Sequence, residues 1–172
     1  ITFIYITHDQ EEAINMSDTI VVMRDGRFEQ IGSPSEIYDH PKTSYVASFV
    51  GSANVLKGTV EDIDGETVVL RNSSGTMVCN REKFSVSKGD EETLAVRSQQ
   101  ISVCSEPNSA CSLTGSIVEN TFVRGMLRLL VKLHDGAEVV VRRHRLNFDY
   151  DIGDQVYLEW EPEQAVFVVM TA

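Results

Sequence analysis

The chain has 172 residues, of which 15 are Lys or Arg and 26 are Asp or Glu, so its formal net charge is −11. This charge argues against nucleic-acid binding as the main activity, because proteins that bind phosphate backbones carry clustered positive charge. No apolar stretch approaches the roughly 20 residues that a membrane-spanning helix needs. Because Asp9, Glu11 and Glu12 interrupt the first apolar run, we expect no signal peptide in it, and any contact with a membrane should go through a partner.

The chain contains three cysteines, Cys79, Cys104 and Cys111, and no Cys-x-x-Cys pair. An odd number without such a pair is typical of free thiols in a reducing compartment. The four histidines are scattered and no His-x-x-x-His motif occurs, so we expect no metal site.

Residues 1–6 form a run of β-branched and aromatic side chains, which predicts a strand buried on both faces. The chain begins at Ile1, inside this pattern. We therefore expect a truncated chain whose first strand has lost its parallel neighbours and seeks another chain or the next hairpin.

A short helix is predicted over residues 9–16, with Asp9 as its cap and Glu12 reaching back as in a capping box. Its inward side should hold Ala13, Ile14 and Met16. His8 lies between the predicted strand and this helix, where α/β folds bind their ligands. Taken alone, His8 also fits a structural histidine beside a sheet.

Residues 19–23 and 27–31 predict two strands joined by Asp25-Gly26, a sequence typical of a type I′ hairpin turn. Residues 20–25 also imitate the apolar strand plus Asp that holds Mg²⁺ in P-loop ATPases. We favour the turn, because Gly26 follows Asp25 and no second carboxylate is present there to polarise water.

Two more helices are predicted before residue 52. Ser33-Pro34-Ser35-Glu36 combines a capping Ser, a Pro at the first helical position and a Glu at the third, and His40-Pro41 ends this helix. Tyr38 should face inward. The next helix starts at Thr43 or Ser44, and Gly51 is expected to follow it in the left-handed conformation.

From residue 55 on, short β segments alternate with polar turns, and the pattern occurs twice. Leu56-Lys57-Gly58-Thr59-Val60 is echoed by Leu113-Thr114-Gly115-Ser116-Ile117, Asp64-Gly65 by Asp135-Gly136, and Gly89-Asp90 by Gly153-Asp154. We interpret these echoes as two related half-units, each too small to bury a core alone. Many short strands of this kind predict a small closed or partly closed barrel, with Trp160 in its core or at an interface.

Two sets of sequence motifs resemble those of a known family. The first resembles the switch-histidine loop of ATP-binding-cassette (ABC) ATPases in importers: Tyr5-Ile6-Thr7-His8-Asp9-Gln10-Glu11-Glu12-Ala13. The run from Gly32 to Gly51 resembles the end of the same nucleotide-binding domain. The resemblance implies that His8 is the catalytic and cofactor-binding residue that reaches the γ-phosphate of ATP in the parent protein.

The second set resembles the TOBE domain, an oligonucleotide-binding-like (OB-like) barrel appended to such ATPases. Its words are Leu94-Ala95-Val96-Arg97-Ser98-Gln99-Gln100-Ile101, Gly115-Ser116-Ile117, Val131-Lys132-Leu133-His134-Asp135-Gly136 and Gly153-Asp154-Gln155-Val156-Tyr157-Leu158-Glu159-Trp160. The family often has Arg-Pro-Glu where this chain has Arg97-Ser98-Gln99. We therefore predict a mainly β fold: a TOBE barrel of two half-units over residues 52–172, preceded by a small α/β remnant of an ABC nucleotide-binding domain over residues 1–51.

The resemblance implies the C-terminal regulatory and dimerisation region of the ATP-hydrolysing subunit of an ABC importer. Hydrolysis needs a Gly-rich loop with Lys around the phosphates and a carboxylate that holds Mg²⁺. The sequence has no Gly-Lys-Ser or Gly-Lys-Thr, no Asp-Glu after an apolar strand and no Ser-Gly-Gly. We expect ATP and Mg²⁺ to bind in the parent protein, and this chain by itself to bind no cofactor and to be inactive.

The same resemblance implies partners and a location. We expect a homodimer formed through the barrel and the exposed N-terminal strand, permease transmembrane subunits as partners of the parent complex, and no nucleic-acid partner. The location would be cytoplasmic, peripheral on the inner face of the cell membrane. Polyamine, iron and sugar importers are the branches considered, and spermidine/putrescine ranks first on Val50-Gly51, Asn54-Val55-Leu56 and Asn147-Phe148-Asp149-Tyr150.

Two alternatives remain. Related barrels hold oxyanions, so the barrel could sense a small ligand, although the acidic charge disfavours an anion site. Arg142-Arg143-His144-Arg145, near Phe148 and Tyr150, is the one basic cluster with aromatic residues and would suit an OB-type nucleic-acid-binding module. The acidic residues around it favour a solvated strand end instead.

Overall fold

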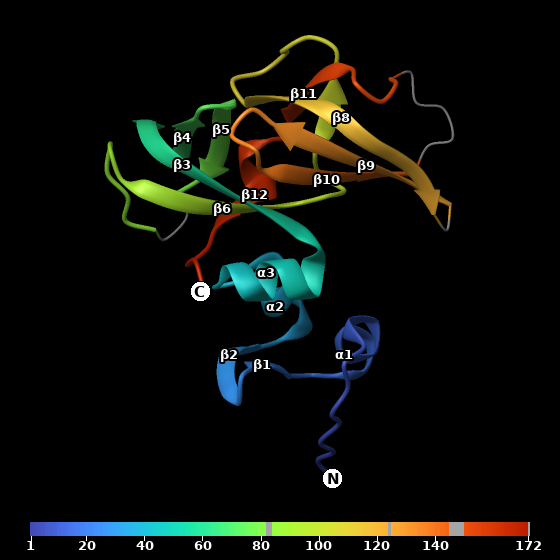
Figure 1. Ribbon diagram of the computed structural model, residues 1–172. Helices are drawn as coiled ribbons and strands as arrows, with labels where there is room; N and C mark the ends of the chain where they lie inside the picture. The colour runs from blue at the N-terminus through green and yellow to red at the C-terminus, as the bar shows by residue number, and fades with distance from the viewer. Residues whose placement is uncertain (82–83, 124, 145–149, 172) are drawn as a thin grey trace.

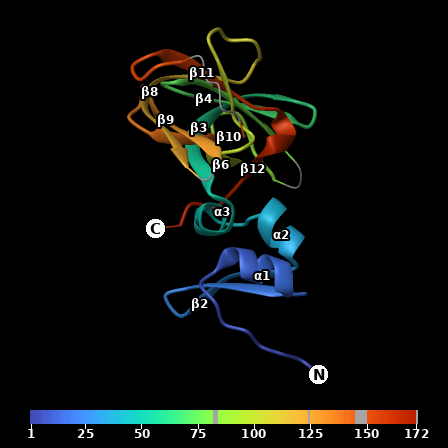
Figure 2. The same ribbon diagram turned by 90° about the vertical axis from the view of Figure 1, so that its right-hand side faces the viewer.

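The computed structural model describes residues 1–81, 84–123, 125–144 and 150–171. Its elements form three tiers that follow the chain order (Figure 1). Helix α1 (Gln10–Met16) and the hairpin of β1 (Ile20–Arg24) and β2 (Arg27–Gly32) form the first tier, α2 (Pro34–Asp39) and α3 (Ser44–Gly51) the second, and a large curled sheet the third. The view turned by 90° shows the same order, so the two helices lie between the hairpin and the large sheet (Figure 2).

The large sheet has ten strands, and each of its strand pairs is antiparallel. They are β3 (Ala53–Asp64), β4 (Thr67–Asn72), β5 (Gly75–Asn80), β6 (Glu91–Arg97), β7 (Ser102–Cys104), β8 (Ser112–Val123), β9 (Met126–Leu133), β10 (Glu138–Arg143), β11 (Gln155–Glu159) and β12 (Ala165–Phe167), with the short 3₁₀ helix η1 (Pro162–Gln164) before β12. The order is β10-β9-β8-β5-β4-β3-β6-β12, and β11 pairs with β7 and β8. The predicted mainly β fold is confirmed.

Residues 1–6 do not form the predicted strand. They make no strand pairing, and the side chains of Ile1, Phe3, Ile4 and Ile6 are at least 87% exposed. A strand needs a neighbour that satisfies its N–H and C=O groups, and within the described residues none lies beside this segment, which points away from the tiers (Figure 1). The prediction of a buried strand is therefore wrong for this chain.

Helix α1 begins as predicted, but its cap differs in one respect. Asp9 Oδ1 accepts hydrogen bonds from the N–H groups of Glu11 (2.9 Å) and Glu12 (3.1 Å). The predicted capping box is wrong, because Glu12 Oε2 accepts from the hydroxyls of Tyr5 (3.1 Å) and Thr7 (3.0 Å) and the Asp9 N–H donates to Thr7 Oγ1. The segment before the helix is thus tied to its first turn.

The turns and caps of the next elements follow the sequence pattern. Asp25 and Gly26 both have positive φ (49° and 75°), as a type I′ turn requires. Ser33 and Glu36 form the predicted capping box at the start of α2: the Ser33 Oγ accepts from the Glu36 N–H, and the Glu36 carboxylate accepts from the Ser33 N–H at 2.8 Å.

The end of α3 differs from the prediction. Gly51 is still helical, and the left-handed residue is Ser52, with φ 48° and ψ 41°. Gly51 is small for another reason: a Cβ at this position would collide with Nη1 of Arg97 from the large sheet. The glycine therefore permits a close approach between α3 and the sheet.

The two predicted half-units are visible in matching irregularities of β3 and β8. Each strand has 12 residues. Each also has a register shift directly after the echoed residues 56–60 and 113–117: between Val60 and Asp62 in β3, and between Ile117 and Glu119 in β8. A bulge bends a strand and increases its twist. Both half-units therefore bend at the same place.

The loops that meet these bulges match as well. Val60 donates to the Asp90 carbonyl (2.9 Å) and accepts from the Gly89 N–H (2.8 Å); Ile117 makes the same pair of bonds with Asp154 (3.0 Å) and Gly153 (2.8 Å). The echo of Gly89-Asp90 in Gly153-Asp154 is thus structural. The proposed echo of Asp64-Gly65 in Asp135-Gly136 is wrong, because the first turn joins β3 to β4 and the second joins β9 to β10.

The half-units exchange their last strands. The chain runs from β6 into β7, yet β7 pairs with β11 of the second half-unit, and β12, which follows β11, pairs with β6 of the first. Neither half-unit therefore holds a complete set of its own strands.

Asn54 ties the end of the sheet order back to its middle. The buried side chain of Asn54, on β3, donates from Nδ2 to the Val140 carbonyl (2.9 Å) and accepts at Oδ1 from the Val140 N–H (2.7 Å). Two residues further along β10, the Arg142 N–H donates to the carbonyl of Ser98, the residue that follows β6 (2.8 Å). Strand β10 is thus held against β3 and the end of β6, and the sheet curls on itself.

Both half-units contribute to one hydrophobic cluster inside the curled sheet. Trp160 lies in it, 4% exposed, and its Nε1–H donates to the Val78 carbonyl at 2.9 Å. This satisfies the one polar group of the indole, as burial of a Trp requires. The predicted core position of Trp160 is confirmed.

Candidate functional site

His8 lies in the turn before α1, and its side chain is exposed. The hydroxyls of Tyr5 and Thr7 are both bound to Glu12, so the chain just before His8 is held against the helix. The hydrogen bond from Tyr5 and the negative charge of Glu12 raise the pKa of the Tyr5 phenol. The position is accessible to a ligand, and the γ-phosphate role of His8 stays a prediction.

A small hydrophobic cluster connects the His8 segment to the helices of the second tier. Its buried members are Ile20, Val22, Ile37 and Val46, and α1 packs Ala13 and Ile14 against them. Met16 was predicted to face inward as well and does not: it is 73% exposed, because it lies at the last turn of α1, beyond the cluster. The first two tiers thus share one core.

The second tier is attached to the large sheet through small side chains and through the C-terminal segment. Ala47 of α3 packs against Ala95 and Val168. The Ser44 N–H donates to the Val169 carbonyl (2.9 Å), and the hydroxyls of Ser44 and Thr171 are 3.0 Å apart. The C-terminal segment therefore lies along the start of α3.

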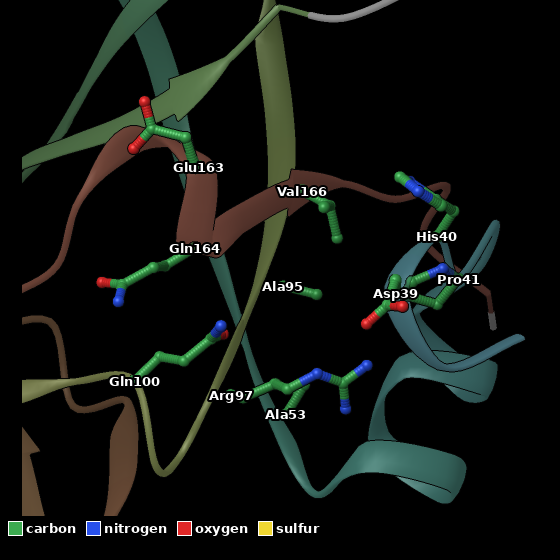
Figure 3. A pocket seen from close by; sticks show the side chains of 10 residues that line it. All are labelled: Asp39, His40, Pro41, Ala53, Ala95, Arg97, Gln100, Glu163, Gln164 and Val166. Carbon is green, nitrogen blue, oxygen red and sulfur yellow. The ribbon is translucent and has the colours of Figure 1, made fainter. Parts of the chain in front are cut away.

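A cavity of about 240 Å³ lies between the end of α2 and the large sheet (Figure 3). Polar and charged side chains line it together with Pro41, Ala53, Ala95 and Val166; they are Asp39, His40, Arg97, Gln100, Glu163 and Gln164. Figure 3 shows Arg97 extending from the sheet toward Asp39 and the helices, whereas Glu163 points away from the helices. The cavity thus lies between the second tier and the large sheet, which are in contact elsewhere.

Arg97 makes the main side-chain contact across this boundary. Its guanidinium carbon lies 3.4 Å from the centroid of the Tyr38 ring, a cation–π geometry. Its Nη1 is buried and has no hydrogen-bond partner. Burial lowers the pKa of Arg97, and the neighbouring Tyr38 and Asp39 oppose this shift. The charge is thus held by an aromatic face rather than by a bonded carboxylate.

A second cavity, of about 270 Å³, shares Gln100 and Gln164 with the first. These two glutamines occupy equivalent turns: the Gln100 N–H donates to the Arg97 carbonyl (3.0 Å) and the Gln164 N–H to the Glu161 carbonyl (2.9 Å). The buried Glu159 in this cavity accepts from the Asn108 N–H at 2.6 Å. The two cavities therefore lie where the half-units meet.

The basic cluster is partly used inside the fold. Arg143 Nη2 donates to the Ile101 carbonyl and to Ser102 Oγ, both at 2.8 Å. Arg145 and Phe148, and most of the segment 147–150, lie outside the described residues. An arginine bound in this way has less freedom to follow a phosphate backbone, which agrees with the preference for a solvated strand end.

Among the described residues, no group of three or more His, Cys, Asp or Glu side chains could hold a metal ion. None of the helices in that part of the chain is both long and apolar enough to span a membrane. In the described residues Cys79, Cys104 and Cys111 form no disulfide, and burial raises the pKa of Cys111 to about 12.

Comparison with known protein families gives a match within the large sheet. Residues 94–168 match the TOBE domain family, so the chain contains a TOBE domain. Its fold is similar to that of the cytoplasmic molybdate-binding protein ModG, solved with molybdate bound: the TM-score is 0.56 at 14% identity, over 67% of this chain and 95% of that one. This likeness concerns the fold alone.

The similarity to complete subunits extends beyond the TOBE domain. The chain is 34% identical to the spermidine/putrescine import ATP-binding protein PotA of Marinobacter nauticus, 37% identical to that of Frankia alni and 36% identical to that of Escherichia coli strain K12. These matches cover 93%, 96% and 93% of the chain and 44%, 38% and 44% of the relatives. The chain belongs with the C-terminal part of the ATP-binding subunits of ABC importers.

The sequence does not predict the contact between Arg97 and Tyr38. Arg97 belongs to the TOBE-like motif of residues 94–101, and Tyr38 is predicted only to face inward. The available signal is an arginine directly after the apolar run of residues 94–96, at the end of β6. It indicates a cation directed at a neighbouring element, but it does not say which one.

Proposed function

We propose that this chain is the C-terminal regulatory and dimerisation region of the ATP-hydrolysing subunit of an ABC importer, with the boundary between its nucleotide-binding part and its TOBE part at residues 51 and 52. The observation that carries the proposal is the extent of the similarity: it covers the His8 segment and the TOBE domain together, over 93% of the chain or more. The names of the relatives favour spermidine or putrescine as the transported substrate.

In this proposal ATP and Mg²⁺ bind to the parent protein. The Gly-Lys-Ser or Gly-Lys-Thr motif that would surround the phosphates is absent from these 172 residues, so the chain alone should not hydrolyse ATP. His8 would contact the γ-phosphate, and its exposed position before α1 supports this role. The core that α1 shares with β1, α2 and α3, and the packing of α3 on the large sheet, support a mechanical route from His8 to the TOBE domain.

The test uses the complete subunit that carries this chain. Substitution His8→Ala should lower magnesium-dependent ATP turnover by about 100-fold or more, the usual effect of removing one group that stabilises transition-state charge. His134→Ala is the matched control, because His134 is exposed in a turn of the TOBE part. Turnover by the isolated chain, or an unchanged rate in the His8 variant, would contradict the proposal.

The proposed partners are a second copy of the subunit and the permease subunits, which would place the complex at the inner face of the cell membrane. The outer face of the β1–β2 hairpin supports a contact surface: Val21 pairs with Ile31 and Met23 with Phe28, and these four side chains are 45–67% exposed. The exposed apolar side chains among residues 1–6 offer a second candidate contact surface. Such patches mark interaction sites in soluble proteins.

Light scattering of the chain at tens of micromolar, about the range for ordinary interfaces, tests the dimer. We expect a dimer for the natural chain and a shift toward monomer for Phe28→Asp. The control is Arg27→Asp, which changes the charge of the same hairpin without removing apolar surface. A natural chain that is monomeric throughout this range would contradict the dimer.

Oxyanion sensing is the second candidate, favoured by the fold shared with ModG. The two cavities argue against it, because carboxylates outnumber the arginine in the lining of each: Asp39 and Glu163 against Arg97 in the first, Glu159 and Glu161 against Arg143 in the second. We expect no thermal stabilisation by molybdate. A ligand at 100 times its dissociation constant stabilises the folded state by about 2.7 kcal/mol, so a clear rise in melting temperature at micromolar molybdate would favour sensing.

A further inference from the structure

We propose that α3 is a pivot fixed to the TOBE domain at both ends, and that the Arg97–Tyr38 contact is a latch that sets the angle between the first two tiers and the large sheet. The inference rests on the proposed function, for which it supplies the means by which the two parts of the subunit sense each other.

The two ends of α3 are attached in different ways. At its start, Ser44 is hydrogen-bonded to the C-terminal segment through its N–H and its hydroxyl, and the Val169 N–H donates to the Lys42 carbonyl at 2.9 Å. At its end, Ser52 joins α3 covalently to β3. Figure 1 shows these attachments at opposite ends of the helix. Two fixed ends limit the movement of α3 relative to the sheet to rotation about a line that passes close to both attachments.

Ser52 lies where α3 ends and β3 begins, the point about which the helix would turn. It is a non-glycine residue in the left-handed region, at φ 48° and ψ 41°. Residues in such conformations persist only where the surrounding structure holds them, and they cluster at switch regions. Between the two ends, α3 meets the sheet through Ala47 against Ala95 and Val168. Such small side chains interlock less than large ones.

The latch lies away from this axis. Arg97 reaches from the end of β6 to the ring of Tyr38 on α2, with 3.4 Å between the guanidinium carbon and the ring centroid. In the described residues Arg97 makes no ion pair, and its buried Nη1 lacks a hydrogen-bond partner. A buried donor without a partner costs free energy, and native structures rarely keep one without a reason. When the contact opens, water can reach this N–H, which offsets part of the free-energy cost of opening it.

The cavity beside the latch provides room for movement. It lies between Asp39, His40 and Pro41 at the end of α2 and the residues of the sheet that face them (Figure 3). Packed interiors have few voids larger than a water molecule and resist small displacements. A space of about 240 Å³ at this boundary allows α2 to approach the sheet or to swing away from it.

Pulsed electron paramagnetic resonance on the chain measures this angle directly. Spin labels are attached to Glu11→Cys on α1 and Glu66→Cys in the turn between β3 and β4, both exposed positions, with Cys104→Ser to remove the half-buried thiol. We expect one narrow distance for the otherwise natural chain. Arg97→Met and Tyr38→Leu should each shift or broaden it, and amide exchange in α2 should become about 10- to 30-fold faster, as expected for loss of a desolvated cation–π contact.

Arg71→Met is the matched control, because Arg71 makes an exposed ion pair with Glu61 on the large sheet, away from the boundary. The fluorescence of the buried Trp160 reports whether each variant keeps the core of the large sheet. An unchanged narrow distance in folded Arg97→Met and Tyr38→Leu would overturn the latch. If Arg97→Met does not fold, Tyr38→Leu alone decides. The result does not depend on ATP turnover, so the latch and the proposed function can fail separately.

Discussion

Asn54 should contribute more to stability than its size indicates, because it replaces a strand neighbour for β10. Its amide satisfies both the N–H and the C=O of Val140, at 2.7 and 2.9 Å. In Asn54→Leu, which keeps four side-chain heavy atoms branched at Cγ, both backbone groups lose their partner. Each unsatisfied buried group costs about 1–3 kcal/mol. Because β10 ends the sheet order and water can reach part of it, we expect a total loss of about 2–4 kcal/mol.

Urea unfolding followed by the fluorescence of Trp160 measures this loss, since Trp160 is buried in the same core. With a slope of about 2 kcal/mol per molar urea, the midpoint should fall by about 1–2 M. Asn15→Leu is the control, because it makes the same substitution at an exposed position on α1. A loss below about 1 kcal/mol in Asn54→Leu, equal to that of the control, would refute the view that this amide closes the sheet.

Three further outcomes are expected. The Cys111 thiol keeps its proton in the folded state up to pH about 12, whereas the unfolded thiol loses it near pH 9. The free energy of unfolding should therefore fall by up to about 1.4 kcal/mol per pH unit between these two values. Cys111→Ala should remove this contribution to the slope in urea titrations. Gly115→Ala should cost about 1–3 kcal/mol, because its Cβ would lie 2.7 Å from the Lys132 carbonyl oxygen; a neutral effect on the melting temperature would contradict this reading. The backbone and hydroxyl hydrogen bonds of Ser33 lower the pKa of Glu36, so Ser33→Ala should raise that pKa in an NMR titration, and the stability from this carboxylate should be lost as the pH falls through its lowered pKa.

Local features of the fold were predictable from the sequence. Asp25-Gly26 needs positive φ at two successive residues, and the Ser33–Glu36 capping box needs hydrogen bonds within four residues, so both are decided by neighbouring atoms. The half-unit repeat was predictable in part. Gly89-Asp90 and Gly153-Asp154 mark equivalent loops, whereas Asp-Gly alone marks any tight turn and led to a wrong match.

Contacts between distant segments were not predictable in this way. The partner of Asn54 is 86 residues away, and the exchange of β7 and β12 leaves no trace in the pattern of either strand. Residues 1–6 carry the composition of a buried strand, but composition does not supply the neighbour that a strand needs. The Arg97–Tyr38 latch combines both problems, since neither residue type specifies the other.

The exchange of β7 and β12 determines where the chain tolerates a break. The loop over residues 105–111 joins the two half-units, and a protease could cleave it without removing any strand from its place. Two halves synthesised separately would each lack the strand that the other contributes. Such fragments should stay incompletely folded alone and recover the native sheet only when mixed, as complementing pieces of one protein.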